Sequence, residues 1–155
     1  MKTRLFLFLA IALCAAFLAS STAAATPASN FTATVLSKGT VANPAEIEAL
    51  GIHYANEGPV DVVVQRGDFV GRSNTGWHQH PGLIVVTVKS GTLLVHNGCH
   101  TATYAAGQSF IEPPLKPIMV EALADAQVVS ILIVPMGHAP RIDVTPAPVC
   151  PATND

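Results

Sequence analysis

The sequence is poor in charge and contains no run of basic residues. Only 12% of its 155 residues are charged, and the eight basic ones are scattered along the chain. A protein that binds nucleic acid or an anionic membrane needs concentrated positive charge on one surface. We therefore expect no nucleic-acid partner and no stable association with a membrane.

The chain also lacks an N-terminal apolar run long enough to span a bilayer comfortably. Residues 5–18 are apolar, Lys2 and Arg4 precede them, and small residues with Ala-x-Ala sites follow at 20–25. These are the three parts of a secretory signal, with an uncleaved membrane anchor as the alternative. We predict a signal peptide at residues 1–25 and a secreted or extracytoplasmic mature protein. Removal of the signal peptide leaves six basic and ten acidic residues, which gives a net charge of about −4.

Cysteine is scarce, with three residues in the whole chain. Cys14 lies in the predicted signal, which leaves Cys99 and Cys150 as an even pair in an exported protein. We predict a disulfide between them that ties the C-terminal tail to the middle of the domain; two free thiols are the alternative. In the chain-entropy model, closing a loop of this length stabilises the fold by about 4 kcal/mol.

Helical periodicity is almost absent, and short β-branched segments alternate with glycine and proline turns. The one predicted helix is short, at residues 43–50, with Asn43 as its cap and Pro44 at its first position. Turns are predicted at residues 66–68, 89–91 and 97–98, and a polar loop at 72–76. The predicted strands are residues 31–36, 60–65, 83–88, 92–96, 101–104, 109–112, 118–122 and 128–134. This pattern indicates an all-β barrel or sandwich.

The predicted organisation has one folded domain. We assign residues 1–25 to the signal peptide and 26–58 to an N-terminal leader with the first strand. Residues 59–137 form the barrel, and residues 138–155 form a proline-rich C-terminal tail. About 130 residues remain after signal removal, which is enough for one modest core.

The segment Gly-Trp-His-Gln-His-Pro-Gly at residues 76–82 carries the main chemical signal. On an extended segment, His78 and His80 point to the same face, and two imidazoles on one face can bind a single metal ion. An apolar strand at residues 83–88 follows, and then the turn glycine Gly91.

With this motif the chain resembles the cupin family. The resemblance covers residues 60–137 and includes a weaker second motif at residues 104–114, followed by a closing strand that ends in Pro135-Met136-Gly137. It implies a jelly-roll barrel, the double-stranded β-helix. It also implies a metal held by three histidines and one glutamate, with zinc, manganese, iron or nickel as the candidates.

Only part of the ligand set that the resemblance implies is present. His78 and His80 match, but Ile84 stands at the glutamate position. The expected second-motif histidine is missing from residues 115–120, and the family's asparagine is replaced by Ala122. The pair is therefore a candidate half-site.

Other residues are candidate partners of this half-site. Glu112 is the nearest carboxylate of the second motif, and His96, His100, His53 and His138 are further candidates; alternation along its strand places His96 outside the barrel.

Lys116 offers a different possibility, because its ammonium could replace the metal's charge and hold a carboxylate ligand directly. The alternative is a solvated surface lysine. Ile84, Val86 and Val88 continue the histidine face and should line an apolar cavity. The predicted ligand-pocket residues are therefore Ile84, Val86, Glu112 and Lys116.

Three functions follow from these residues. The first is small-molecule binding in an apolar cavity, with weak or absent metal binding. The second is a metal-dependent enzyme of the dioxygenase, isomerase or quercetinase type, built around His78 and His80. The third is a partner-binding protein that uses the tail or a barrel face. The resemblance also allows a homodimer, and whether the protein is an enzyme stays open.

Overall fold

The computed structural model describes residues 26–145, and in this part of the chain every regular element is a β-strand. The strands are β1 (Ser29–Val41), β2 (Ala45–Ala49), β3 (Ile52–Asn56), β4 (Val60–Asn74), β5 (His78–Gln79), β6 (Leu83–Ser90), β7 (Thr92–Asn97), β8 (His100–Ala105), β9 (Ser109–Glu112), β10 (Ile118–Ala122), β11 (Ala126–Pro135) and β12 (Ile142–Asp143). The all-β prediction is confirmed, and the bounds of β9 and β10 are those predicted.

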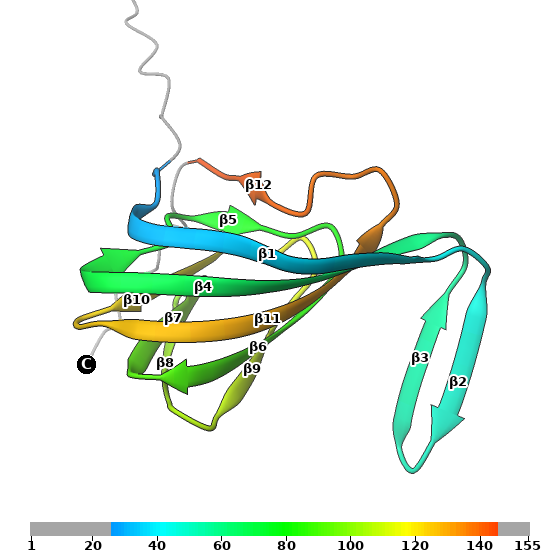
Figure 1. The fold of residues 1–155 in the computed structure, drawn as a ribbon, viewed down its shortest axis with the longest axis horizontal. Coiled ribbons are helices and arrows are strands. Elements are labelled where there is room, and N and C mark those ends of the chain that lie inside the picture. The colour runs from blue at the N-terminus through cyan, green and yellow to red at the C-terminus, as the bar shows by residue number, and fades with distance from the viewer. Residues whose placement is uncertain (1–25, 146–155) are drawn as a thin grey trace, which may run out of the picture.

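Ten strands form one antiparallel sheet that folds into a nearly closed jelly-roll barrel (Figure 1). One side consists of β1, β4, β11, β6 and β9 in adjacent positions, and the other of β12, β5, β10, β7 and β8. The two sides meet where the last residues of β4 pair with the last residues of β10. β1 runs along β4 from end to end, so the predicted leader supplies a strand of the barrel.

The core fills the space between these two sides. Along β11 and β6, every second side chain is buried, as expected for strands with one face inward. Ile84, Leu93, Ile118 and Leu132 are each no more than 1% exposed. The apolar alternation seen in the sequence therefore marks the inner face of the barrel.

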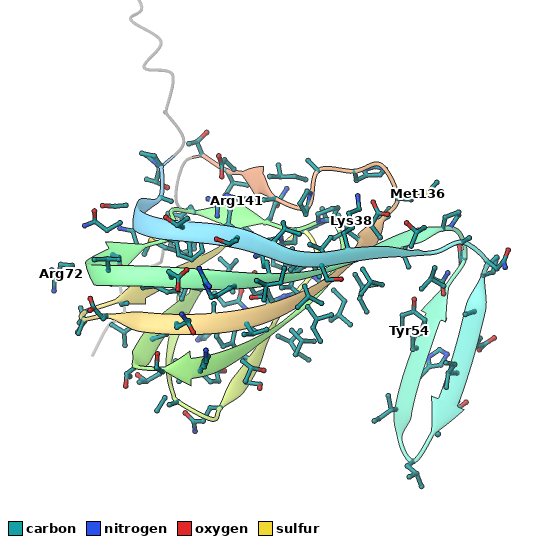
Figure 2. All side chains as sticks on the ribbon, in the orientation of Figure 1. Lys38, Tyr54, Arg72, Met136 and Arg141 are labelled. Atoms are coloured by element: carbon teal, nitrogen blue, oxygen red, sulfur yellow. The ribbon has the colours of Figure 1, made fainter. Side chains whose placement is uncertain are left out.

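The helix predicted at residues 43–50 is wrong. This segment is β2, which pairs with β3 as a separate two-stranded sheet that extends away from the barrel (Figures 1 and 2). Leu50 and Gly51 connect the two strands, both with positive φ, which is the geometry of a two-residue hairpin turn. The turn and the cross-strand pairing outweigh the local helix signals of Asn43 and Pro44.

The turn predicted at residues 66–68 is also wrong, because β4 continues through it to Asn74. Gly67 serves packing instead: a Cβ at this position would lie 2.7 Å from a methyl carbon of Val128 and 2.9 Å from the ring of Phe31. A glycine inside a strand often marks such a close approach. The predicted polar loop at 72–76 is correspondingly shorter.

Two predictions fall outside the described residues. The signal peptide at residues 1–25 is one, and Cys150, with the disulfide predicted to Cys99, is the other. Both remain predictions. Within residues 26–145, no helix has the length and hydrophobicity needed to cross a membrane.

Candidate metal centre

Three buried side chains converge inside the barrel: His78, His80 and Glu112. One potential ligand atom from each lies within 4.8 Å of the others. The carboxylate Oε2 of Glu112 is 2.7 Å from Nε2 of His80 and 3.8 Å from Nε2 of His78. The two imidazole rings stand nearly perpendicular, at 89°. The structure thus adds a carboxylate to the half-site predicted from the sequence.

The two histidines are positioned by a very short strand. His78 lies in β5, where it pairs with Ile118 of β10 on one side and with Asp143 of β12 on the other. Gly76, two residues earlier, has a positive φ. A Cβ at this position would lie 2.0 Å from the backbone oxygen of Thr26. Only glycine tolerates both conditions, so this residue fixes the path by which the chain enters the His-x-His segment.

Glu112 comes from a different strand than the resemblance implies. In the ladder between β6 and β9, Glu112 lies directly opposite Ile84. Opposite residues on adjacent antiparallel strands point to the same face, with Cβ atoms about 5 Å apart. Both side chains are buried, Ile84 being 1% and Glu112 5% exposed. The carboxylate missing at residue 84 is therefore supplied one strand away.

Hydrogen bonds to main-chain carbonyls orient both imidazoles. Nδ1 of His78 donates to the oxygen of Gly76 at 2.9 Å, and Nδ1 of His80 donates to the oxygen of Pro140. A carbonyl can only accept, so each Nδ1 carries the proton and, in the neutral ring, each Nε2 keeps its lone pair. This is the arrangement by which proteins orient histidines that bind metals through Nε2.

Burial keeps His78 neutral. It lowers the pKa of His78 from 6.5 to about 4, chiefly because the charged imidazolium would lose its hydration, and the positive charge of Arg141 acts in the same direction. The negative charge of Glu112 opposes both effects and does not overcome them. His78 therefore presents a free lone pair at neutral pH.

The donor set fits a divalent cation. Oε2 of Glu112 lies 2.7 Å from Nε2 of His80, which is ion-pair distance when that ring is protonated, and this buried oxygen has no hydrogen-bond partner. An unpartnered carboxylate oxygen facing two imidazole nitrogens is costly to bury unless a cation satisfies it. Two histidines and one carboxylate are a ligand set for catalytic zinc and for non-haem iron.

The three side chains line a cavity of about 200 Å³ inside the barrel. Most of its wall is apolar, and Ile84 and Val86 are part of it, as is Glu112. The wall also includes Phe31, Phe69, Phe110, Val120, Val128 and Leu132. A small organic molecule in this space would meet the three ligand atoms, a largely apolar surface and the few polar side chains of Gln65, Thr75, Ser130 and Arg141.

The segment at residues 138–145, here named the C-terminal strap, passes over this cavity. Its β12 pairs with β5, and Pro140 and Arg141 both contribute to the cavity wall. Arg141 lies beside β12 at the edge of the barrel in Figure 2. Its Nη2 donates to the main-chain oxygen of Thr75 at 2.7 Å, and its Nε donates to Oδ1 of Asp143 at 2.7 Å. No motif in the sequence predicts that the tail reaches the site.

The other candidates lie elsewhere. Lys116 is exposed on the turn after β9, where its main-chain nitrogen donates to the oxygen of Pro113, and it is not among the residues that line the cavity. The main-chain nitrogen of Leu115 donates to the oxygen of His80 at 2.8 Å, so this turn lies next to the His-x-His segment, but the Lys116 side chain is not part of the cavity wall that the alternative ligand scheme required. His53, His100 and His138 are also exposed.

His96 lies on the outer side of β7, as alternation predicted. Its Nδ1 is 2.9 Å from the hydroxyl of Thr101, and its Nε2 is 3.5 Å from Oε2 of Glu121. The neighbouring Leu93 and Val95 are buried. His96 thus belongs to a histidine–glutamate pair that is separate from the candidate metal centre.

Comparisons with known proteins give structural neighbours only. No protein-family model matches the chain, and no curated protein matches its sequence. Similar solved structures include an RmlC-like cupin from Shewanella frigidimarina (13% identity, 72% of this chain and 86% of that chain, TM-score 0.49). A second is a conserved Streptococcus pyogenes protein of unknown function (22% identity, 49% and 67%, TM-score 0.47). A third is an oxalate oxidase in complex with the substrate analogue glycolate (20% identity, 54% and 46%, TM-score 0.48).

These identities and TM-scores are too low to support any statement about activity. The assignment of the fold relies on the strand order and on the motif at residues 76–82. Among the similar solved structures, two are named as cupins. The chain itself forms a nearly closed antiparallel barrel, as the all-β jelly roll predicted from the sequence requires.

Proposed function

We propose that the protein is a metal-dependent enzyme that acts on a small organic molecule in the barrel cavity. The observation that carries this proposal is the convergence of His78, His80 and Glu112, with an unpartnered carboxylate oxygen at the centre of the group. This reverses the order of preference drawn from the sequence, where metal binding was expected to be weak or absent. The reason is the position of Glu112, which adds a third potential metal ligand to the two histidines.

The residues present would hold the metal through Nε2 of each histidine and through the carboxylate of Glu112. A divalent metal with three protein ligands supplies Lewis acidity and open positions for water or for a ligand. The carbonyls of Gly76 and Pro140 fix the imidazole orientations, and the apolar wall limits access of water to the bound molecule. Metal analysis of the purified protein decides among zinc, manganese, iron and nickel.

The second candidate is a small-molecule binding protein that works without metal. It is favoured by two isoleucines: Ile84 stands where the resemblance implies a glutamate, and Ile118, buried and opposite His78, lies in the region where it implies a third histidine. Both fill space with apolar atoms. In this case the cavity would retain the ligand by burial alone.

Metal analysis of the purified mature protein separates the two candidates. Growth in medium supplemented with each metal should give about one equivalent of bound metal in the wild type and none in His78→Ala. The matched control is His96→Ala, because His96 also faces a glutamate but lies outside the barrel. Wild-type protein without metal after such growth, and after addition of each metal to the apoprotein, would contradict the enzyme proposal and leave the binding protein.

The remaining expectations stay predictions. A signal peptide, a secreted location, the disulfide between Cys99 and Cys150, and a homodimer each need their own measurement. N-terminal sequencing of the exported protein, thiol titration with and without reductant, and sedimentation equilibrium would supply them.

A further inference from the structure

Arg141 is the one arginine or lysine among the described residues that line the cavity. It belongs to the C-terminal strap, which follows both predicted motifs in the sequence. Arginine carries its charge at every relevant pH and has five N–H donors in a planar fork that matches a carboxylate. A fixed cation in a mostly apolar wall calls for an explanation.

The known contacts of Arg141 hold it in place without using all its donors. Nε binds Asp143 and Nη2 binds the carbonyl of Thr75, each at 2.7 Å. Thr75 is itself fixed, because its hydroxyl accepts from the main-chain nitrogen of Val120 at 2.9 Å. The side chain of Asp143 is 53% exposed, so water screens its charge and it neutralises the guanidinium only in part.

We propose that Arg141 binds the carboxylate of the ligand, and that the substrate class is a small monocarboxylate whose apolar part occupies the cavity. This inference relies on the proposed function for the metal's contribution, but the cation itself belongs to the chain. It assigns a binding function to a residue of the C-terminal strap that neither motif includes.

The charge balance of the cavity supports an anionic ligand. Among the described lining residues, Glu112 contributes one negative charge and Arg141 one positive charge, and the two histidines are counted as neutral because a histidine that binds a metal through Nε2 carries no charge. A divalent metal at the three ligands would make the site positive by two charges. A ligand with a carboxylate reduces this excess, whereas a neutral or cationic ligand leaves it or increases it.

The size and polarity of the cavity restrict the rest of the molecule. Its volume of about 200 Å³ is below the roughly 300–1,000 Å³ of pockets for drug-sized ligands. Val86, Phe110 and Leu132 present only carbon to it. An inorganic anion such as phosphate has no apolar part to cover these side chains, so a short aliphatic or aromatic carboxylate fits better.

Binding of matched acids and amides tests the inference. Acetate, butyrate and benzoate, each paired with its primary amide, would be titrated by calorimetry into wild-type, Arg141→Gln and Arg66→Gln protein, in metal-loaded and metal-free form. Arg66 is the matched control because its Nε also binds an aspartate two residues later, Asp68, at 2.8 Å, on the outer side of β4. Metal content and thermal unfolding are measured for every variant.

The expected result has three parts. Wild-type protein binds at least one acid more tightly than its amide, Arg141→Gln weakens that acid by about ten- to a hundredfold, and amide binding is unchanged. Arg66→Gln behaves as wild type. If Arg141 contributed only to the structure, Arg141→Gln would weaken the binding of acid and amide alike, and that outcome overturns the proposal. Two other outcomes also overturn it: acid binding that Arg141→Gln leaves unchanged, and a wild-type protein that binds no acid more tightly than its amide.

The metal-free form separates this inference from the proposed function. If the protein binds no metal but still prefers the acids through Arg141, the proposed enzyme fails and the anion site stands. If metal binds and Arg141→Gln has no effect on the acids, the anion site fails and the enzyme stands.

Discussion

Protonation of His78 should make the metal-free protein unstable in mild acid. In the folded state the pKa of His78 is about 4, because the ring is buried, against 6.5 for an unperturbed histidine. Between these two pH values the unfolded chain binds a proton at this position and the folded protein does not. The free energy of unfolding therefore falls as the pH drops from 6.5 toward 4.

The size of the effect follows from the two pKa values. At pH 5 the unfolded imidazole is almost fully protonated and the folded one is about nine-tenths neutral, so the contribution of His78 lowers the free energy of unfolding by about 2 kcal/mol relative to pH 8. At pH 4 the loss is about 3 kcal/mol. The neighbouring groups His80, Glu112 and Arg141 contribute to this folded-state pKa and are the same residues in wild type and in His78→Gln.

Urea unfolding of the metal-free protein at pH 8, 6, 5 and 4 measures this contribution. His78→Gln should lack it, so the stability difference between wild type and this variant should change by about 2 kcal/mol between pH 8 and pH 5. His53→Gln is the control, because His53 is exposed on the β2–β3 hairpin and its loss removes no buried imidazole. Parallel pH profiles for wild type and His78→Gln would refute the reasoning.

Three further predictions concern the metal ligands and the packing around them. Glu112→Ile should lower zinc affinity at least a hundredfold, since replacing even an outer partner of a ligand costs 10- to 100-fold. Adding Ile84→Glu should restore the affinity to within about tenfold, because the two positions lie opposite each other on adjacent strands. Equilibrium dialysis measures both affinities, and a double variant without restored affinity would contradict the cross-strand account. Gly82→Ala should destabilise the fold by about 3 kcal/mol in chemical unfolding, because its Cβ would lie 2.0 Å from a main-chain oxygen of β11; an unchanged midpoint would show that the strands can separate there. Leu132→Ala should cost about 3 kcal/mol and Ile131→Thr, its half-exposed neighbour, less than about 0.5 kcal/mol; equal losses would mean that burial does not set the stability of β11.

The sequence was a good guide wherever a local pattern decides the structure. The strand after the His-x-His pair, the turn at Gly91 and the strands β9 and β10 each have their own alternation and flanking turn residues. The helix predicted at residues 43–50 failed although Glu, Ala and Leu favour a helix over a strand locally. Only the pairing of β2 with β3 decides between them.

The candidate site was half predictable. His78 and His80 are adjacent in sequence and need only an extended backbone to share a face. Glu112 depends on the register between β6 and β9, and a shift of one residue would turn it outward. The position of Arg141 depends on the path of the C-terminal strap, about 60 residues after the histidines in the sequence. Neither the spacing nor the composition of this segment predicts that path.

The hydrogen bond from His80 to Pro140 has a consequence for the order in which the protein matures. All three candidate ligands lie within residues 78–112, but the carbonyl that fixes the His80 ring arrives with the C-terminal strap. A chain that has emerged only as far as β11 contains every ligand and lacks the contact that orients one of them. In the proposed enzyme, the metal site is therefore complete only after the strap has docked, and not when the barrel strands alone have folded.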